Sequence, residues 1–153
     1  MKPSDFTLLL IKPDALPYKT KIVQQIHYSG FGIVVSKNSF VFSAEEVRRF
    51  YEEHADKPFF PEHSRFMQSG TCTVYLLRQI LPSEVPAFEK LRQIVGSTDP
   101  TKAEEGTIRK RYGTNLPRNA VHASDSVEAV KREALFFFSG FDLIRYGAGE
   151  LVP

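Results

Sequence analysis

The chain has 153 residues, 42% hydrophobic and 25% charged, with a formal net charge of +2 at pH 7. This length fits one domain, residues 1–153, which can bury a core without disulfides or metal ions. The near-neutral charge argues against nucleic acid as a partner, and no apolar run approaches the ~20 residues of a membrane span. Cys72 has no partner for an internal disulfide, and the first apolar run begins too early to leave room for a leader, so we expect a cytoplasmic protein.

The N-terminal third predicts a strand, a helix and a second strand. Residues 6–11 form a continuous apolar run typical of a central strand, and Lys12 should emerge at its end because the proline that follows favours an extended conformation. Apolar residues at helical spacing predict a helix over 19–29, which Gly30 would end. Residues 31–42 are then a second strand.

An inserted helical hairpin is predicted next. Ser43 and Glu46 have the spacing of a capping box, which opens a helix with an apolar side that includes Tyr51. A second short helix is predicted over 62–69. The two helices should lie beside the sheet as a pair.

The remaining elements complete an alternating pattern. We expect a strand over 71–77, a helix over 85–95, a short strand at 120–121 and a last helix over 126–138. Residues 97–117 show no strand or long helix, and a loop of that length is usually functional. The order predicts an α+β, ferredoxin-like βαββαβ sandwich with an inserted helical hairpin and a long loop before the last strand.

His122 is the candidate nucleophile. It passes from a short apolar run into three good helix-capping residues at 124–126, so we expect it at a strand-to-helix junction, where a helix N-terminus favours a bound anion. An imidazole with an ordinary pKa of about 6.5 is mostly neutral at pH 7 and can attack phosphorus without a separate base. Taken alone, a histidine of this kind is more often a helix-capping or core residue than a nucleophile.

Five motifs together resemble the nucleoside diphosphate kinase family along nearly the whole chain. They lie at 11–15, 51–61, 67–70, 106–109 and 119–126. The resemblance implies that His122 takes the γ-phosphate from a nucleoside triphosphate and passes it to a diphosphate in a ping-pong reaction, with Mg²⁺ carried by the phosphates. It also implies a homo-oligomer, either a hexamer or a tetramer of a common dimer.

The resemblance assigns roles to further residues. Glu133 would accept a hydrogen bond from the imidazole nitrogen that does not attack, Ser124 would support that contact, and Tyr51 would reach the histidine or the γ-phosphate with its hydroxyl. Lys12, Arg92, Thr98 and Arg109 would hold the phosphates. Phe59 and Leu116 would clamp the base by stacking, and Lys12 and Asn119 would bind the ribose.

Several of these residues also have a plainer structural interpretation. Arg92 and Arg109 fit solvated surface cations, and Glu133 fits an exposed helix carboxylate. Tyr51 would also serve as a core aromatic, and Phe59 as a hydrophobic staple.

Three features depart from the family pattern. Ala123 stands where glycine is usual, and its methyl group would cost ~1 kcal/mol or more if the backbone there needs a positive φ. His63 stands where an apolar residue is usual at the lip of the base pocket, so we do not assign it the role of that apolar residue. The segment 81–87 is a few residues longer than in the family pattern. These departures leave a second interpretation open: a catalytically weak or inactive nucleotide-binding module of the same fold, with a regulatory or protein-interaction role.

Overall fold

A computed structural model describes all residues, 1–153. Its centre is a four-stranded sheet in the order β2-β3-β1-β4, in which every neighbouring pair is antiparallel. The strands are β1 (Phe6–Ile11), β2 (Phe31–Phe40), β3 (Cys72–Gln79) and β4 (Val121–Ala123). The predicted ferredoxin-like arrangement is confirmed.

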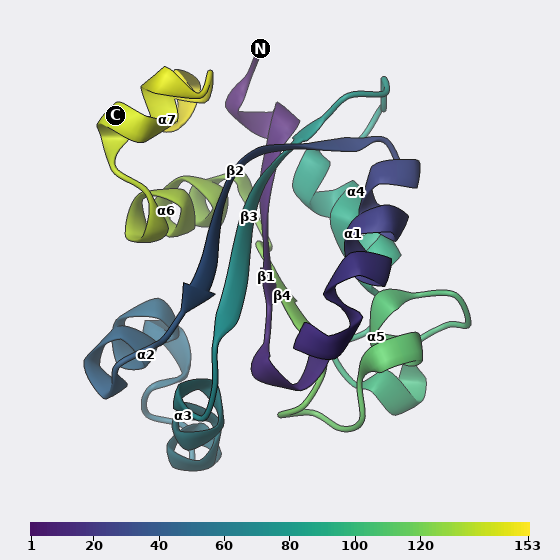
Figure 1. Cartoon of the computed structure of the whole chain (residues 1–153), viewed down its shortest axis with the longest axis vertical. Coiled ribbons are helices and arrows are strands. Elements are labelled where there is room, and N and C mark those ends of the chain that lie inside the picture. The colour runs from purple at the N-terminus through teal and green to yellow at the C-terminus, as the bar shows by residue number, and fades with distance from the viewer.

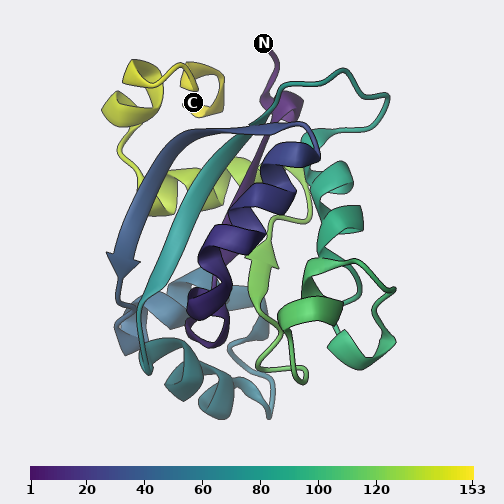
Figure 2. The ribbon, with the colours of Figure 1, turned by 45° about the vertical axis from the view of Figure 1, so that its right-hand side comes forward.

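Helices cover both faces of the sheet (Figures 1 and 2). One face carries α1 (Lys19–Tyr28), α4 (Ala87–Val95) and α5 (Ile108–Tyr112). The other carries α2 (Ala44–Phe50), α3 (Phe60–Gln68), α6 (Val127–Phe137) and α7 (Gly140–Arg145). Short 3-10 helices lie at Pro3–Asp5, Pro13–Tyr18, Glu52–His54, Pro100–Lys102 and Gly149–Leu151. None of the helices is both long and apolar enough to cross a membrane.

The sheet separates two hydrophobic cores. Successive side chains of a strand point to opposite faces, so Leu8 and Leu10 enter one core while Leu9 and Ile11 enter the other. Because β1 is central and covered on both sides, all six of its residues are buried, which explains its continuous apolar run.

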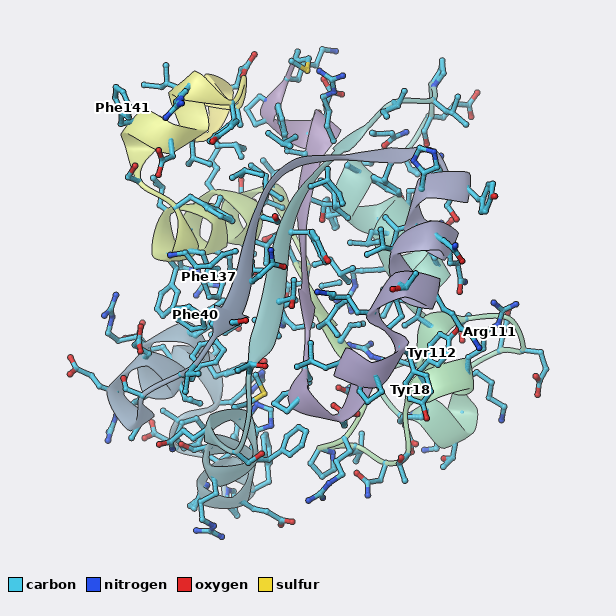
Figure 3. The ribbon with its side chains drawn as sticks, viewed as in Figure 1. Tyr18, Phe40, Arg111, Tyr112, Phe137 and Phe141 are labelled. Atoms are coloured by element: carbon cyan, nitrogen blue, oxygen red, sulfur yellow. The ribbon has the colours of Figure 1, made fainter.

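Aromatic pairs mark the two layers. Phe40 of β2 and Phe137 of α6 meet edge to face, with ring centroids 5.1 Å apart, on one side of the sheet. Tyr18 and Tyr112 stack at 5.0 Å on the other side (Figure 3). Each pair therefore ties together segments that are distant in the sequence.

The structure changes several predicted boundaries. The strand predicted over 31–42 ends at Phe40, and the helix predicted over 85–95 begins at Ala87 because Pro86 occupies its N-cap. The last strand begins at Val121, since Ala120 has a φ of 73° and is not extended. Two short helices, α5 and α7, were not predicted; Thr107 and Ser139 cap their N-termini.

Two turn and cap predictions are confirmed. Ser43 Oγ accepts the backbone N–H of Glu46 at 3.1 Å, and a carboxylate oxygen of Glu46 accepts the N–H of Ser43 at 3.0 Å. Gly30 follows α1 with a φ of 95°, a conformation that glycine adopts without strain. These features fix where α2 begins and where β2 enters the sheet.

Candidate active site

The predicted site residues come together at one pocket of about 580 Å³. It lies between the α2 and α3 hairpin, the long loop before β4 and the start of α6. All but one of the predicted residues line it: Lys12, Tyr51, Phe59, Arg92, Thr98, Arg109, Leu116, Asn119, His122 and Glu133. The exception, Ser124, is fully buried beside Glu133.

Pairing of β4 with β1 fixes the backbone of His122, which lies opposite Leu10. Four residues later Ser126 caps α6 by accepting the N–H of Ala129, so the helix starts close to the histidine. His122 is thus the middle residue of a three-residue strand, just before the junction where we expected it.

Glu133 projects from α6 toward the imidazole. Nε2 of His122 lies 2.9 Å from Oε1 of Glu133, and Ser124 Oγ donates to the same oxygen at 2.7 Å. A carboxylate partner holds the proton on Nε2. The other ring nitrogen, Nδ1, has no hydrogen-bond partner in the protein and keeps its lone pair free.

The Glu133 carboxyl is ionised in spite of its burial. Burial works to raise its pKa, but the charge and hydrogen bond of His122, the Ser124 hydroxyl and Arg132 outweigh that effect, and the pKa lies below its ordinary value. Arg132 contributes a contact of 3.5 Å to the second carboxylate oxygen. The interpretation of Glu133 as an exposed helix carboxylate is therefore wrong, since the side chain is 5% exposed.

Two aromatic rings surround the imidazole. Phe50 and Tyr51 both meet it edge to face, with centroid distances of 4.9 and 5.7 Å. The Tyr51 hydroxyl is buried without a hydrogen-bond partner, and burial raises its pKa, so it stays protonated. An unpaired buried hydroxyl is unfavourable, and a ligand oxygen in the pocket would relieve that cost.

Lys12 and Asn119 form a polar pair at the floor of the pocket. Lys12 Nζ donates to Oδ1 of Asn119 at 2.8 Å, and the Asn119 amide donates to the carbonyl of Thr98 at 3.0 Å. Burial and the nearby charge of Arg109 lower the pKa of Lys12 to about 8. A buried cation of this kind is well suited to bind an anion that enters the pocket.

Arg109 is anchored by three backbone carbonyls. Its Nε, Nη1 and Nη2 donate to Asn119, Gly96 and Val121 at 3.3, 3.1 and 3.0 Å. Burial and the charge of Arg92 lower its pKa to about 10. The guanidinium is buried, so the solvated-cation interpretation is wrong for Arg109, whereas Arg92 is exposed and makes only a 3.5 Å contact with the carbonyl of Ala123.

A strained γ-turn precedes β4. Ala120 has a φ of 73°, and the N–H of Val121 donates back to the carbonyl of Asn119 at 2.9 Å. Asp14 Oδ2 accepts the N–H of Ala120 at 3.0 Å, and the N–H of Lys12 donates to the carbonyl of Ala120 at 2.9 Å. These contacts hold in place the backbone that carries both Asn119 and His122.

The concern about backbone strain therefore applies to another residue. The sequence pattern pointed to Ala123, but Ala123 lies in β4, and the left-handed residue is Ala120. Asp14, which clamps that turn, had no predicted role. Its position directly after Lys12-Pro13 is the one sequence feature that places it close to the site.

The mouth of the pocket carries the predicted base clamp. Phe59 and Leu116 are 55% and 56% exposed and come from separate segments, the start of α3 and the long loop. His63 lies one helical turn after Phe59, with its ring edge on Tyr51 at 4.6 Å. No role in the pocket was predicted for the other polar groups that line it: Glu53, His54, Glu62, Asp125 and Arg132.

Known proteins share this fold and sequence pattern. Residues 5–143 match the sequence model of the family described as nucleoside diphosphate kinase. The chain is 41% identical over 140 residues to the nucleoside diphosphate kinase of Persephonella marina, covering 90% of this chain and 96% of that protein. The enzyme of Paracoccus denitrificans is 40% identical over 140 residues, with the same coverage.

Solved structures agree. The Aquifex aeolicus nucleoside diphosphate kinase superposes with a TM-score of 0.81 and 36% identity, covering 90% of this chain and 97% of that one. The halophilic nucleoside diphosphate kinase of Halobacterium salinarum, solved in complex with CDP, gives a TM-score of 0.80 and 31% identity, covering 90% and 89%.

Proposed function

The chain belongs to the nucleoside diphosphate kinase family, and we propose that within this phosphotransferase activity His122 carries the phosphoryl group between nucleotides. The activity is transfer of the γ-phosphate of a nucleoside triphosphate to a nucleoside diphosphate. The observation that supports His122 is the 2.9 Å contact of its Nε2 with Glu133, which leaves the other ring nitrogen, Nδ1, without a partner in the protein. A nucleotide-binding module without turnover would not need this contact.

Nδ1 of His122 is the attacking atom in this mechanism. Its lone pair forms a bond to the γ-phosphorus while the bond from that phosphorus to the β,γ-bridging oxygen breaks, and the nucleoside diphosphate leaves with the electron pair. The ring becomes positively charged, and Glu133 stabilises it through the Nε2 proton. The reverse sequence with a second diphosphate regenerates the free imidazole.

Charged and hydroxyl groups would stabilise the transferring phosphoryl group. Lys12 and Arg109 are buried in the pocket, and the guanidinium of Arg109 keeps two N–H groups beyond its three backbone contacts. Arg92, Thr98 and the Tyr51 hydroxyl line the same space. Each charge-assisted hydrogen bond contributes roughly 1.5–3 kcal/mol, so several together lower the barrier substantially.

The nucleoside would lie between the mouth and the floor of the pocket. Phe59 and Leu116 are placed to hold the base by its faces, which does not discriminate among bases. Lys12 and Asn119 would bind the ribose hydroxyls, with Lys12 also facing the phosphates. This arrangement fits an enzyme that accepts several nucleotides.

Mg²⁺ would enter with the phosphates. No group of three or more His, Cys, Asp or Glu side chains is placed to hold a metal ion, so phosphate oxygens and water would supply most of its ligands. Asp125, a carboxylate that lines the pocket three residues after His122, would help to hold the hydrated ion. When bound, the ion would neutralise part of the phosphate charge.

We further propose a cytoplasmic homo-oligomer. Cys72 is a buried free thiol, which suits a reducing compartment. A closed symmetric assembly, either a hexamer or a tetramer of dimers, is supported by the exposed apolar side chains of Ile33 and Val41 at the edge strand and just beyond it. Light scattering on the purified protein tests this, and a monomeric mass would contradict it.

Intact-mass measurement tests the nucleophile. After brief incubation with Mg²⁺ and ATP, the wild type and a His27→Ala control, which lacks an exposed histidine of α1, should each gain one phosphoryl group. His122→Ala should gain none. Addition of GDP should discharge the adduct and yield GTP. A folded wild type that binds ATP without forming the adduct would overturn the proposal and leave a nucleotide-binding module.

A further inference from the structure

His63 brings hydrogen-bonding atoms to a part of the pocket that is also lined by the rings of Tyr51 and Phe59. It belongs to the first turn of α3, where its backbone N–H donates to the carbonyl of Phe59 at 3.1 Å. Its ring meets Tyr51 nearly perpendicularly, with centroids 4.6 Å apart. Neither ring nitrogen forms a hydrogen bond within the protein, so both remain available to a ligand.

The imidazole of His63 is neutral under physiological conditions. Burial, together with the nearby charges of Lys12, His54 and His122, lowers its pKa to about 4. A neutral ring carries one N–H donor and one acceptor nitrogen. It can therefore bind a hydroxyl group either as donor or as acceptor.

The position of His63 along the pocket indicates what it meets. Phe59, one turn earlier in the helix, stands at the exposed mouth, while Tyr51, which His63 contacts, lies against His122. A nucleotide with its base at the mouth and its γ-phosphate at His122 would place its sugar between these ends. His63 lies at that intermediate depth.

We propose that His63 is a specificity-determining residue that hydrogen-bonds the 2′-hydroxyl of the sugar, so that the enzyme favours ribonucleotides over deoxyribonucleotides. This inference rests on the nucleotide orientation in the proposed function. An apolar side chain would contact both sugars equally. A neutral hydrogen bond gained only by the ribose form corresponds to a preference of roughly three- to tenfold.

Calorimetric binding of GDP and dGDP, and of ADP and dADP, in the presence of Mg²⁺ tests the proposal. The variants are His63→Leu, which restores an apolar group, His63→Gln, which keeps a donor and an acceptor, and His27→Leu, which removes an imidazole from the exposed surface of α1. We expect the ribose-to-deoxyribose affinity ratio to fall about threefold or more in His63→Leu, mainly through weaker GDP and ADP binding. The ratio should stay near that of the wild type in the other two variants.

Three results would overturn the inference. These are a wild-type ratio near one, a ratio unchanged in His63→Leu, and a change in the ranking of bases at a constant sugar ratio, which would make His63 a reader of the base. Binding does not require phosphoryl transfer. The binding measurements therefore test the contact of His63 with the sugar, and the mass measurement tests phosphorylation of His122 independently.

Discussion

The Ser124 hydroxyl donates to Oε1 of Glu133 at 2.7 Å and is completely buried. The same oxygen faces Nε2 of His122, so the serine fixes the carboxylate that in turn fixes the ring. Second-layer contacts of this kind act on the orientation of the reacting group without touching the substrate.

Removal of the Glu133 charge should slow phosphorylation of His122. Glu133→Gln keeps the size of the side chain but cannot stabilise a positively charged ring, so we expect a loss of about 10- to 100-fold in the single-turnover rate with ATP. Ser124→Ala should cost less, roughly three- to tenfold. Rapid-quench mass spectrometry measures both, with Glu128→Gln on the exposed side of α6 as the control. Equal rates in Glu133→Gln and the control would refute the role.

Arginine at position 109 should not be replaceable by lysine. An ammonium group cannot reproduce three hydrogen bonds to carbonyls spread over Gly96, Asn119 and Val121, so we expect Arg109→Lys to lose about 2–4 kcal/mol of stability. Arg92→Lys, at an exposed position, should change stability by less than about 0.5 kcal/mol. Urea unfolding of both variants makes the comparison, and similar midpoints would contradict it.

Backbone strain at Ala120 predicts a difference between two alanine-to-glycine changes. Both Ala120 and Ala123 are buried, and each change removes one methyl group. Each change also raises the conformational entropy of the unfolded chain by the same amount. Only Ala120 has a positive φ, so Ala120→Gly should be more stable than Ala123→Gly by about 1–2 kcal/mol. Thermal unfolding of the pair checks this. The reverse order would show that the turn carries no strain.

Burial of Lys12 predicts a pH dependence of stability. Its pKa is about 8 in the folded protein against 10.5 as the ordinary value, so between these values the unfolded chain binds more protons than the folded one. The contribution of Lys12 to the free energy of unfolding therefore rises with pH across this window. In Lys12→Met that contribution is absent.

The stability of Lys12→Met relative to wild type should thus fall by roughly 2–3 kcal/mol between pH 7 and pH 10. Urea unfolding of both proteins at the two pH values measures the difference, because the titration of other groups largely cancels. Parallel pH profiles would mean that Lys12 keeps an ordinary pKa in the folded state.

Local patterns in the sequence were enough to predict most of the fold. The apolar run of β1, the capping box at Ser43 and the glycine after α1 can each be recognised within a few residues of sequence. The short helices α5 and α7 were missed because five or six residues give too little periodicity to identify a helix.

The contacts and burial of the site residues were harder to predict than which residues belong to the site. The side chains that the family resemblance named do lie around one pocket, but burial decides what each can do, and burial depends on distant segments. The sequence left Arg109 open between a phosphate ligand and a surface cation, and only its three carbonyl partners exclude the surface cation. The positive φ lies at Ala120, whose N–H is held by Asp14. No local pattern encodes a contact across 106 residues.

That separation has a consequence for how the protein is made. Lys12 meets Asn119 across 107 positions, and β1 pairs with β4 only after that stretch has been synthesised. At about 5–20 residues per second, a ribosome needs roughly 5–20 seconds to cover the distance. During this time β3 can pair with one edge of β1, but the opposite edge stays unpaired until β4 has been synthesised. Nucleotide therefore cannot guide the early stages of folding and can only capture a nascent chain whose last quarter has begun to emerge.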